Sequence, residues 1–262
     1  MTQHEQKQRL DDGKKRVNKR DPLLIFLVIV LILLLLTIAF VLLRHKSQVQ
    51  RPDIKLADLS GKIWVSYGDS ITDGGFWQAD VAEAFGLQHI DQGVGGTCVA
   101  GYGSLAFWQA GRLDQIIAAQ PTLLTIMGGT NDFFSNFPLG DESQFDLDLA
   151  DKEVATFLGA YSYMIEYLQM SLPDTTIVIM ATPVNYLSFS DTPCNDRGDS
   201  IADYQKACQQ VADHYGLIFV PLRQLQADPV HWEQDFWDGI HPNLEGAAKI
   251  SQELIQALKQ YQ

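Results

Sequence analysis

Short β-rich runs alternate with longer stretches of helical spacing between residues 62 and 258, and this alternation constrains the fold more than any other feature. Five strands are predicted, at residues 62–68, 87–91, 122–127, 175–180 and 217–220. Helices are predicted after each of them, at residues 76–86, 105–119, 154–170, 201–215 and 244–258. Such a repeat predicts a parallel sheet with helices on both faces. Nearly continuous apolar strands such as residues 123–127 (LLTIM) fit burial on both sides.

The composition fits one folded domain of this class. Hydrophobic residues make up 46% of the 262 residues, which is ample for a core and excludes a mostly disordered chain. The alternating region, about 200 residues long, suits a single domain. The formal net charge of −13 argues against a nucleic-acid partner, because contacts with phosphates need clustered Lys and Arg.

Ahead of the alternating region lies an uncharged apolar run, residues 22–43 (PLLIFLVIVLILLLLTIAFVLL). As a helix rising about 1.5 Å per residue, this run spans roughly 33 Å, enough to cross a hydrocarbon core of about 30 Å. It is longer than the roughly 7–15 apolar residues of a cleaved signal peptide, and it leads into Arg44 without a small-x-small cleavage site. The pattern favours an uncleaved transmembrane signal anchor.

The charges that flank the run predict its orientation. Seven Lys and Arg residues precede it and four follow it closely, so the positive-inside rule favours a cytoplasmic N-terminus. The large C-terminal part is then expected outside the cell membrane. We expect a basic cytoplasmic segment, the anchor, a polar stalk and an extracellular folded domain at residues 1–21, 22–43, 44–61 and 62–262.

Four polar or glycine-rich clusters follow predicted strands or precede the last helix. They are residues 68–72 (GDSIT), 93–97 (GVGGT), 128–132 (GGTND) and 238–242 (DGIHP). In open parallel α/β sheets, the working residues lie on loops at the carboxyl ends of the strands. We therefore expect the four clusters to converge on one rim of the sheet.

Together the clusters contain every group that acyl transfer by a serine requires. Ser70, directly after a strand, a glycine and an aspartate, is the candidate nucleophile. His241 is the candidate general base, and Asp238 lies three residues earlier, close enough to orient the imidazole ring. The backbone N–H groups of Ser70 and Gly96 and the side-chain amide of Asn131 are candidate donors to an oxyanion.

The same residues resemble the sequence blocks of the SGNH/GDSL hydrolase family of esterases and lipases. Residues 68–70 (GDS) resemble its Gly-Asp-Ser signature. Residues 91–96 (DQGVGG) resemble its second block, although Asp91 stands where many members have Asn. Residues 129–132 (GTND) are similar to the third block, and residues 238–242 to the Asp-x-x-His block.

This resemblance extends from residue 62 to the C-terminus and implies both a fold and an activity. The implied fold is a flavodoxin-like three-layer α/β/α sandwich around a five-stranded parallel sheet. The resemblance implies a triad of Ser70, Asp238 and His241, and an oxyanion hole formed by Ser70, Gly96 and Asn131. It implies the hydrolysis of an ester, without a metal or organic cofactor.

Other interpretations use some of the same residues. A metal site would need ligand-type spacing, and no H-E-x-x-H motif occurs among the six His. Residues 101–104 (GYGS) lack the Lys of a phosphate-binding loop. His231 is the runner-up base and Cys98 an alternative nucleophile, although Cys98 has no base nearby in sequence. A non-catalytic module that binds a glycan or a partner is the alternative from another class.

The substrate stays open at this stage. A membrane-anchored hydrolase could deacetylate glycans or, as a lipase or lysophospholipase, cleave acyl chains from lipids. The acidic domain favours a saccharide or small acyl ester over a lipid with an anionic headgroup. Aromatic residues near the clusters fit either core packing or an acyl pocket or sugar-stacking platform: Phe76, Trp77, Phe133, Phe134, Phe137, Trp232, Phe236 and Trp237.

The remaining polar residues near the clusters are expected to be structural. Asp69 and Asp132 flank candidate catalytic residues, and we expect each to shape its loop by accepting hydrogen bonds from backbone amides. His89 and His214 lie in a predicted strand and a predicted helix. The three cysteines allow at most one disulfide within the chain: Cys98, Cys194 and Cys208.

Overall fold

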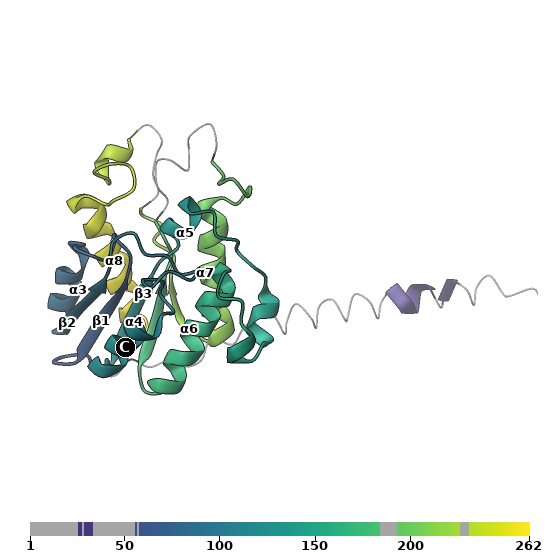
Figure 1. Cartoon of the computed structure of the whole chain (residues 1–262), viewed down its shortest axis with the longest axis horizontal. Helices are drawn as coiled ribbons and strands as arrows, with labels where there is room; N and C mark the ends of the chain where they lie inside the picture. Colours follow the sequence, from purple (N-terminus) through teal and green to yellow (C-terminus); the bar gives the residue numbers. More distant parts are fainter. Residues whose placement is uncertain (1–25, 28, 34–55, 57, 184–192, 226–230) are drawn as a thin grey trace, which may run out of the picture. The chain divides into compact units, whose positions relative to one another are not determined.

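A computed structural model describes residues 26–27, 29–33, 56, 58–183, 193–225 and 231–262 (Figure 1). The chain divides into two compact units, Met1–Gln50 and Arg51–Gln262. In the first unit, residues 26–27 and 29–33 are helical. No helix among the described residues is long and apolar enough to cross a membrane, and most of the predicted anchor, residues 22–43, lies outside the described part.

The second unit is built around a five-stranded parallel sheet, as predicted. Its strands are β1 (Ile63–Gly68), β2 (Gln88–Gly93), β3 (Leu123–Met127), β4 (Thr176–Met180) and β5 (Ile218–Val220). The strand order is β2-β1-β3-β4-β5, and every neighbouring pair is parallel. This order reverses direction between β1 and β3, and in flavodoxin-like sheets ligands bind at the carboxyl ends of the strands beside such a reversal.

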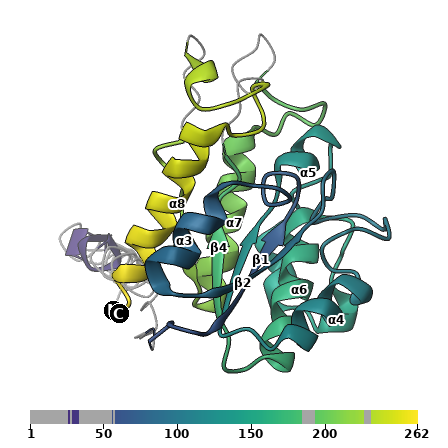
Figure 2. The ribbon, with the colours of Figure 1, turned by 90° about the vertical axis from the view of Figure 1, so that its left-hand side faces the viewer.

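Helices cover both faces of the sheet (Figure 2). The long helices are α3 (Trp77–Phe85), α4 (Ala110–Ala119), α6 (Phe157–Ser171), α7 (Ile201–Tyr215) and α8 (Leu244–Lys259). Helices α3 and α8 pack together on one face, whereas α4, α6 and α7 contribute to the core on the other. The short elements are α5 (Thr130–Phe134), η1 (Glu142–Asp146), η2 (Leu149–Asp151) and η4 (Trp232–Gln234).

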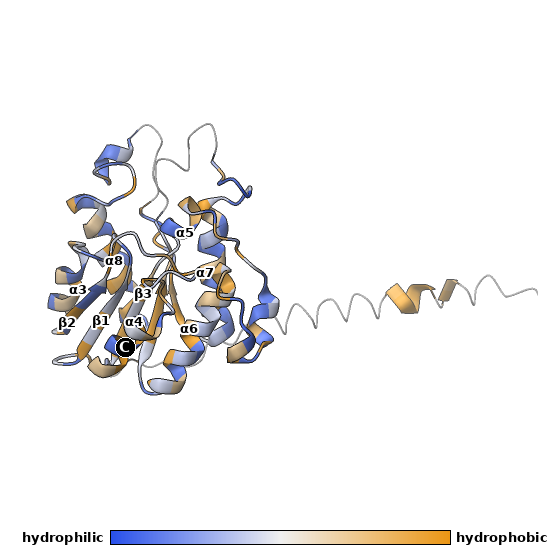
Figure 3. Cartoon of the chain, viewed as in Figure 1, coloured by the Kyte–Doolittle hydropathy of each residue, from blue (hydrophilic) through white to orange (hydrophobic). Residues whose placement is uncertain are grey.

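The two cores follow directly from the two-residue period of the strands. Trp64 and Leu123 are register partners and face α3 and α8, whereas Val65 and Leu124, one position later, face α4, α6 and α7. All four side chains are fully buried. Burying such a side chain stabilises the fold by about 1.5–3 kcal/mol. Strand β3 (LLTIM) is therefore largely apolar, whereas the edge strand β2 (QHIDQG) and the outer faces of the helices are hydrophilic (Figure 3).

Local signals set where the helices begin and end. Helix α3 ends at Gly86, whose φ of +65° is a conformation that glycine adopts without strain. Helix α7 begins with a capping box between Ser200 and Asp203, in which each side chain accepts from the other residue's backbone N–H. Such caps satisfy backbone groups that have no partner within the helix.

The structure differs from the predicted elements in a few places. Helix α4 begins at Ala110 rather than at residue 105, because residues 105–109 form turns held by bonds such as that from Phe107 N–H to the Cys98 carbonyl (2.9 Å). Strand β2 continues to Gly93, which pairs with Gly68. Helix α5 was not predicted, because five residues are too few to show a helical period.

The folded unit also begins earlier than predicted. Residues 44–61 are predicted as a polar stalk, yet Leu56 and Leu59 are buried in the core on the α3 and α8 side. The Leu56 N–H donates to the Tyr261 carbonyl oxygen over 2.7 Å. These contacts place the last part of the predicted stalk in the fold.

Candidate active site

A sharp turn after β1 presents Ser70. Strand β1 ends at Gly68, and Asp69 accepts the backbone N–H of Ile71 on its side chain over 2.9 Å. A Cβ at position 68 would lie 2.1 Å from Thr72 Oγ1 and 2.7 Å from the Met127 carbonyl oxygen, so the turn has no room for a side chain there. The close packing of this turn against β3 fixes where Ser70 leaves the sheet.

The structure brings Ser70, His241 and Asp238 into one hydrogen-bonded row. His241 Nε2 lies 3.0 Å from Ser70 Oγ, although 171 residues separate them in the sequence. His241 Nδ1 lies 2.7 Å from Asp238 Oδ2. An ionised carboxylate can only accept, so Nδ1 carries the ring proton and Nε2 is free to accept from the Ser70 hydroxyl. His241, and not the runner-up base His231, is the histidine beside Ser70 Oγ.

The Asp238 carboxylate is held by its own loop. Its Oδ1 accepts the backbone N–H groups of Ile240 (3.0 Å) and His241 (2.8 Å). Partial burial acts to raise the pKa of Asp238, but the hydrogen bonds from the backbone and ring of His241 and from Ile240 outweigh it and lower the pKa. Asp238 is therefore ionised at neutral pH, and its orientation is fixed.

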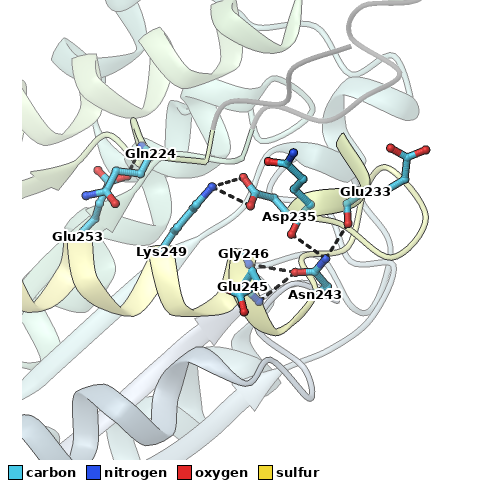
Figure 4. Close-up of polar contacts among 9 residues, drawn as sticks. Gln224, Glu233, Asp235, Asn243, Glu245, Gly246, Lys249 and Glu253 are labelled. Atoms are coloured by element: carbon cyan, nitrogen blue, oxygen red, sulfur yellow. Dashed lines mark hydrogen bonds and ion pairs between the residues drawn. The ribbon is translucent and has the colours of Figure 1, made fainter. Parts of the chain in front are cut away.

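The loop that carries Asp238 and His241 is closed by backbone bonds and anchored on α8. Trp237 N–H donates to the His241 carbonyl oxygen over 2.8 Å, and Phe236 forms an antiparallel bridge with Pro242. Asn243 caps α8 by accepting the N–H groups of Glu245 and Gly246, and its amide donates to two carbonyl groups in η4 (Figure 4). Lys249, one turn further, pairs with Asp235. The base is thus positioned by a loop that is hydrogen-bonded to itself and to the start of α8.

Besides the Ser70 N–H, the predicted oxyanion donors come from two further loops at the same rim. Gly96 has a φ of +74°, which favours glycine, and lies in the turn after β2. Asn131, at the start of α5, donates from Nδ2 to the Thr97 carbonyl oxygen over 2.9 Å. An amide nitrogen carries a second N–H, which this bond leaves available. Within the described residues, the backbone N–H groups of Ser70 and Gly96 have no intramolecular acceptor.

Asp132 ties these two loops together. One of its carboxylate oxygens accepts the N–H of Val99 (2.9 Å) and the other that of Ala100 (2.8 Å), as expected for a loop-shaping residue. Burial raises the pKa of Asp132 to about 7, although the two backbone N–H groups act to lower it. Burial likewise raises the pKa of Asp69 to about 6, against the Ile71 N–H and the nearby His241 and Arg112. Both carboxyl groups are fully enclosed and point away from bulk solvent.

Two residues that support the site were missed by the sequence analysis. Asp73 Oδ2 accepts the N–H of Gly95 over 3.1 Å and thereby joins the nucleophile turn to the oxyanion loop. The buried Arg112 on α4 donates to the carbonyl groups of Gly68 (3.3 Å) and Gln92 (3.0 Å), at the ends of β1 and β2. No local pattern identifies either residue, because both act on segments distant in the sequence.

The other histidines and cysteines named in the sequence analysis are not part of the row formed by Ser70, His241 and Asp238. His89 lies 2.8 Å from Ser66 Oγ, and His214 stacks on Phe145. All three cysteines are free thiols. Burial, with the neighbouring charge of Asp132, raises the pKa of Cys98 to about 12, so this thiol stays protonated and is a poor nucleophile. Among the described residues, no group of three or more His, Cys, Asp or Glu side chains could hold a metal ion.

The chain matches a protein-family model. The model of the GDSL-like lipase/acylhydrolase family matches residues 66–249, a range that contains all four clusters. A search of curated proteins finds no significant match.

Several solved structures share the fold. A protein from Lactobacillus plantarum is 23% identical with a TM-score of 0.65, over 78% of this chain and 99% of that one. A GDSL-like lipase from Bacteroides thetaiotaomicron is 20% identical with a TM-score of 0.56, over 84% and 97% of the two chains. An acetylxylan esterase from Geobacillus stearothermophilus is 20% identical with a TM-score of 0.54, over 77% and 96%.

Proposed function

The chain belongs to the GDSL-like lipase/acylhydrolase family of carboxylic ester hydrolases, and from this premise we propose that it cleaves esters through Ser70, His241 and Asp238. The observation that carries the proposal is the row in which His241 lies 3.0 Å from Ser70 Oγ and 2.7 Å from Asp238. A nucleophile within hydrogen-bond reach of a base, and a base oriented by a third group, are the requirements for covalent hydrolysis.

The first half of the reaction forms an acyl-enzyme. Ser70 Oγ attacks the ester carbonyl carbon while His241 Nε2 takes the hydroxyl proton, and a tetrahedral intermediate results. Asp238 keeps the ring in the tautomer that can accept this proton and stabilises the imidazolium. The intermediate collapses when the carbon–oxygen bond to the alcohol breaks and His241 returns the proton to the departing oxygen.

The second half releases the acid. A water molecule gives a proton to His241 Nε2 and attacks the acyl carbon, and the second tetrahedral intermediate expels Ser70 Oγ, which recovers the proton. In both intermediates the negative oxygen accepts hydrogen bonds from the backbone N–H groups of Ser70 and Gly96 and from Asn131. Removing one such donor typically costs about 2.7–4 kcal/mol of transition-state stabilisation.

The substrate we propose is an acetyl ester of a glycan. The structural similarity to an acetylxylan esterase supports it, and so does the acidic balance of residues 52–262, which carry nine Lys and Arg against 28 Asp and Glu. A lipid ester is the second candidate, because the family includes lipases and because residues 22–43 would hold the enzyme beside acyl chains.

We also propose that residues 22–43 anchor the chain in the cell membrane with the catalytic unit outside. The support is the uncharged apolar run and the larger number of basic residues before it. The expected result is that alkaline carbonate leaves the full chain in the membrane pellet, and that protease added to intact cells digests the catalytic unit. Release by carbonate, or full protection from protease, would contradict the anchor or its orientation.

The catalytic proposal is tested with the full chain and a Ser70→Ala variant. The wild type should hydrolyse p-nitrophenyl acetate and react with a fluorophosphonate probe, and Ser70→Ala should do neither. Ser60→Ala, which removes an exposed serine on the loop before β1, serves as the matched control and should behave as wild type. Labelling of Ser70→Ala would refute the assignment of the nucleophile, and an unlabelled wild type would favour a non-catalytic binding module.

A further inference from the structure

A cavity of about 180 Å³ opens beside the nucleophile on the side of the base. Its walls include Ser70 and His241, whereas Gly96 and Asn131 do not contribute. In the proposed mechanism the oxyanion points toward Gly96 and Asn131, and the departing alcohol must lie where His241 can return a proton to it. The cavity therefore lies on the side of the alcohol half of the ester, not on that of the oxyanion.

Two exposed aromatic side chains line this cavity. Phe76, which directly precedes α3, is 57% exposed, and Trp237, which directly precedes Asp238, is 64% exposed. Trp77, also in the lining, is buried and donates from its indole N–H to the Ile71 carbonyl oxygen over 3.1 Å. The bond between Trp237 N–H and the His241 carbonyl fixes the Trp237 backbone beside the base. The exposed pair thus offers apolar faces to a ligand without forming part of the core.

One carboxylate completes the lining. Asp73 Oδ2 is bound to the Gly95 N–H, and within the described residues Oδ1 accepts no hydrogen bond. Both Asp73 Oδ2 and Ser70 Cβ come within 4 Å of the point where a Cβ on Gly95 would lie, so this carboxylate is close to the reacting atoms. A negative charge here disfavours anionic alcohols and leaves an acceptor for a hydroxyl group.

We infer that this cavity is the subsite for the alcohol half of the substrate, and that the alcohol is a single neutral pyranose ring with its C–H face on Phe76 and Trp237 and a hydroxyl on Asp73. The inference rests on the proposed function and adds the chemistry of the leaving group. The cavity is smaller than the roughly 300–1,000 Å³ of pockets for drug-sized ligands, so it suits one ring and not a long chain.

The test compares two esters that share the acyl group and differ in the alcohol: a mono-O-acetylated methyl pyranoside and ethyl acetate. In the full chain, combined Phe76→Ala and Trp237→Ala substitutions should lower kcat/KM for the pyranoside by about tenfold or more, because both aromatic faces are lost. The same variant should hydrolyse ethyl acetate within about twofold of the wild type, because that alcohol reaches neither ring. A variant with Phe76→Ala and Trp237→Phe should lose less of the pyranoside kcat/KM than the double alanine variant, because it keeps one aromatic face.

Tyr102→Ala is the matched control, because Tyr102 is 70% exposed but does not line the cavity, and it should change neither rate. An unchanged pyranoside rate in the double variant, or equal losses on both esters in a variant that melts as wild type does, would overturn the inference. A selective loss on acetylcholine instead of the pyranoside would also overturn it, by identifying a cation site. If the double variant does not fold, the same comparison of kcat/KM for the pyranoside and for ethyl acetate is made with Phe76→Ala alone. Failure of the proposed function is a separate result: no Ser70-dependent hydrolysis of ethyl acetate.

Discussion

Replacing Asp238 with Asn tests the orientation of the base, because the structure determines how the new amide must lie. In the wild type, Oδ1 accepts two backbone N–H groups at 2.8 and 3.0 Å, and Oδ2 faces His241 Nδ1 at 2.7 Å. If the asparagine placed its NH2 group toward the two backbone donors, both hydrogen bonds would be lost, each worth about 1 kcal/mol. The asparagine oxygen therefore stays on the backbone and the NH2 group faces the ring.

This orientation forces the wrong tautomer. The NH2 group donates to Nδ1, so the ring proton moves to Nε2, which then cannot accept the proton of the Ser70 hydroxyl. We expect kcat for p-nitrophenyl acetate to fall by roughly 10⁴-fold, the size of loss that this tautomer change causes in a serine triad. KM should change little, because Asp238 is not expected to contact the substrate.

The assay is steady-state kinetics at pH 8 for the full chain and Asp238→Asn, with thermal melting to confirm that the variant folds. A variant that melts like the wild type yet keeps kcat within about tenfold would show that Asp238 does not set the tautomer of the base. That result would refute the reasoning even if Ser70 proved to be the nucleophile.

Three further predictions follow from other contacts. Asn131→Ala should lower kcat by roughly 100- to 1,000-fold at similar KM in steady-state assays, and an unchanged kcat would remove Asn131 from the oxyanion hole. Gly68→Ala should destabilise the fold by about 1–3 kcal/mol in urea unfolding, because its Cβ would lie 2.1 Å from Thr72 Oγ1, whereas Gly103→Ala, with open space around it, should be close to neutral. The buried Asp69 and Asp132 carboxyls, whose pKa values are raised to about 6 and about 7, stabilise the fold most below their unfolded pKa of about 3.9, and this contribution is lost as pH rises through 6 and 7. The free energy of unfolding from urea titrations should therefore contain a component that decreases between pH 4 and 8, and Asp132→Asn should reduce that slope; an unaltered slope would contradict the assignment.

The sheet was predictable because each strand carries its own local signal. The β-branched run of β4 and the apolar run of β3 indicate strands without any knowledge of their neighbours in the sheet. Gly86 indicates the end of α3, because glycine readily adopts the left-handed conformation that ends a helix. The boundary near residue 56 was not predictable, because Leu56 is buried only through contacts with distant parts of the chain, such as Tyr261.

The convergence of Ser70, His241 and Asp238 followed from a single rule, that the loops at the carboxyl ends of parallel strands share one rim. The contacts of Asp73 with Gly95 and of Arg112 with Gly68 could not be predicted, because they depend on how separate loops and helices pack. The same holds for the cavity lined by Phe76 and Trp237, since sequence alone does not distinguish an exposed aromatic side chain from a buried one.

Mass spectrometry of the acid-quenched reaction tests the central claim most directly. After the full chain is mixed with p-nitrophenyl acetate and quenched within its first turnovers, the account predicts one added acetyl group, located by fragmentation on Ser70. In Asp238→Asn the same adduct should form far more slowly. An acetyl group on another residue, or turnover without any covalent adduct on Ser70 under conditions that trap it, would contradict the account.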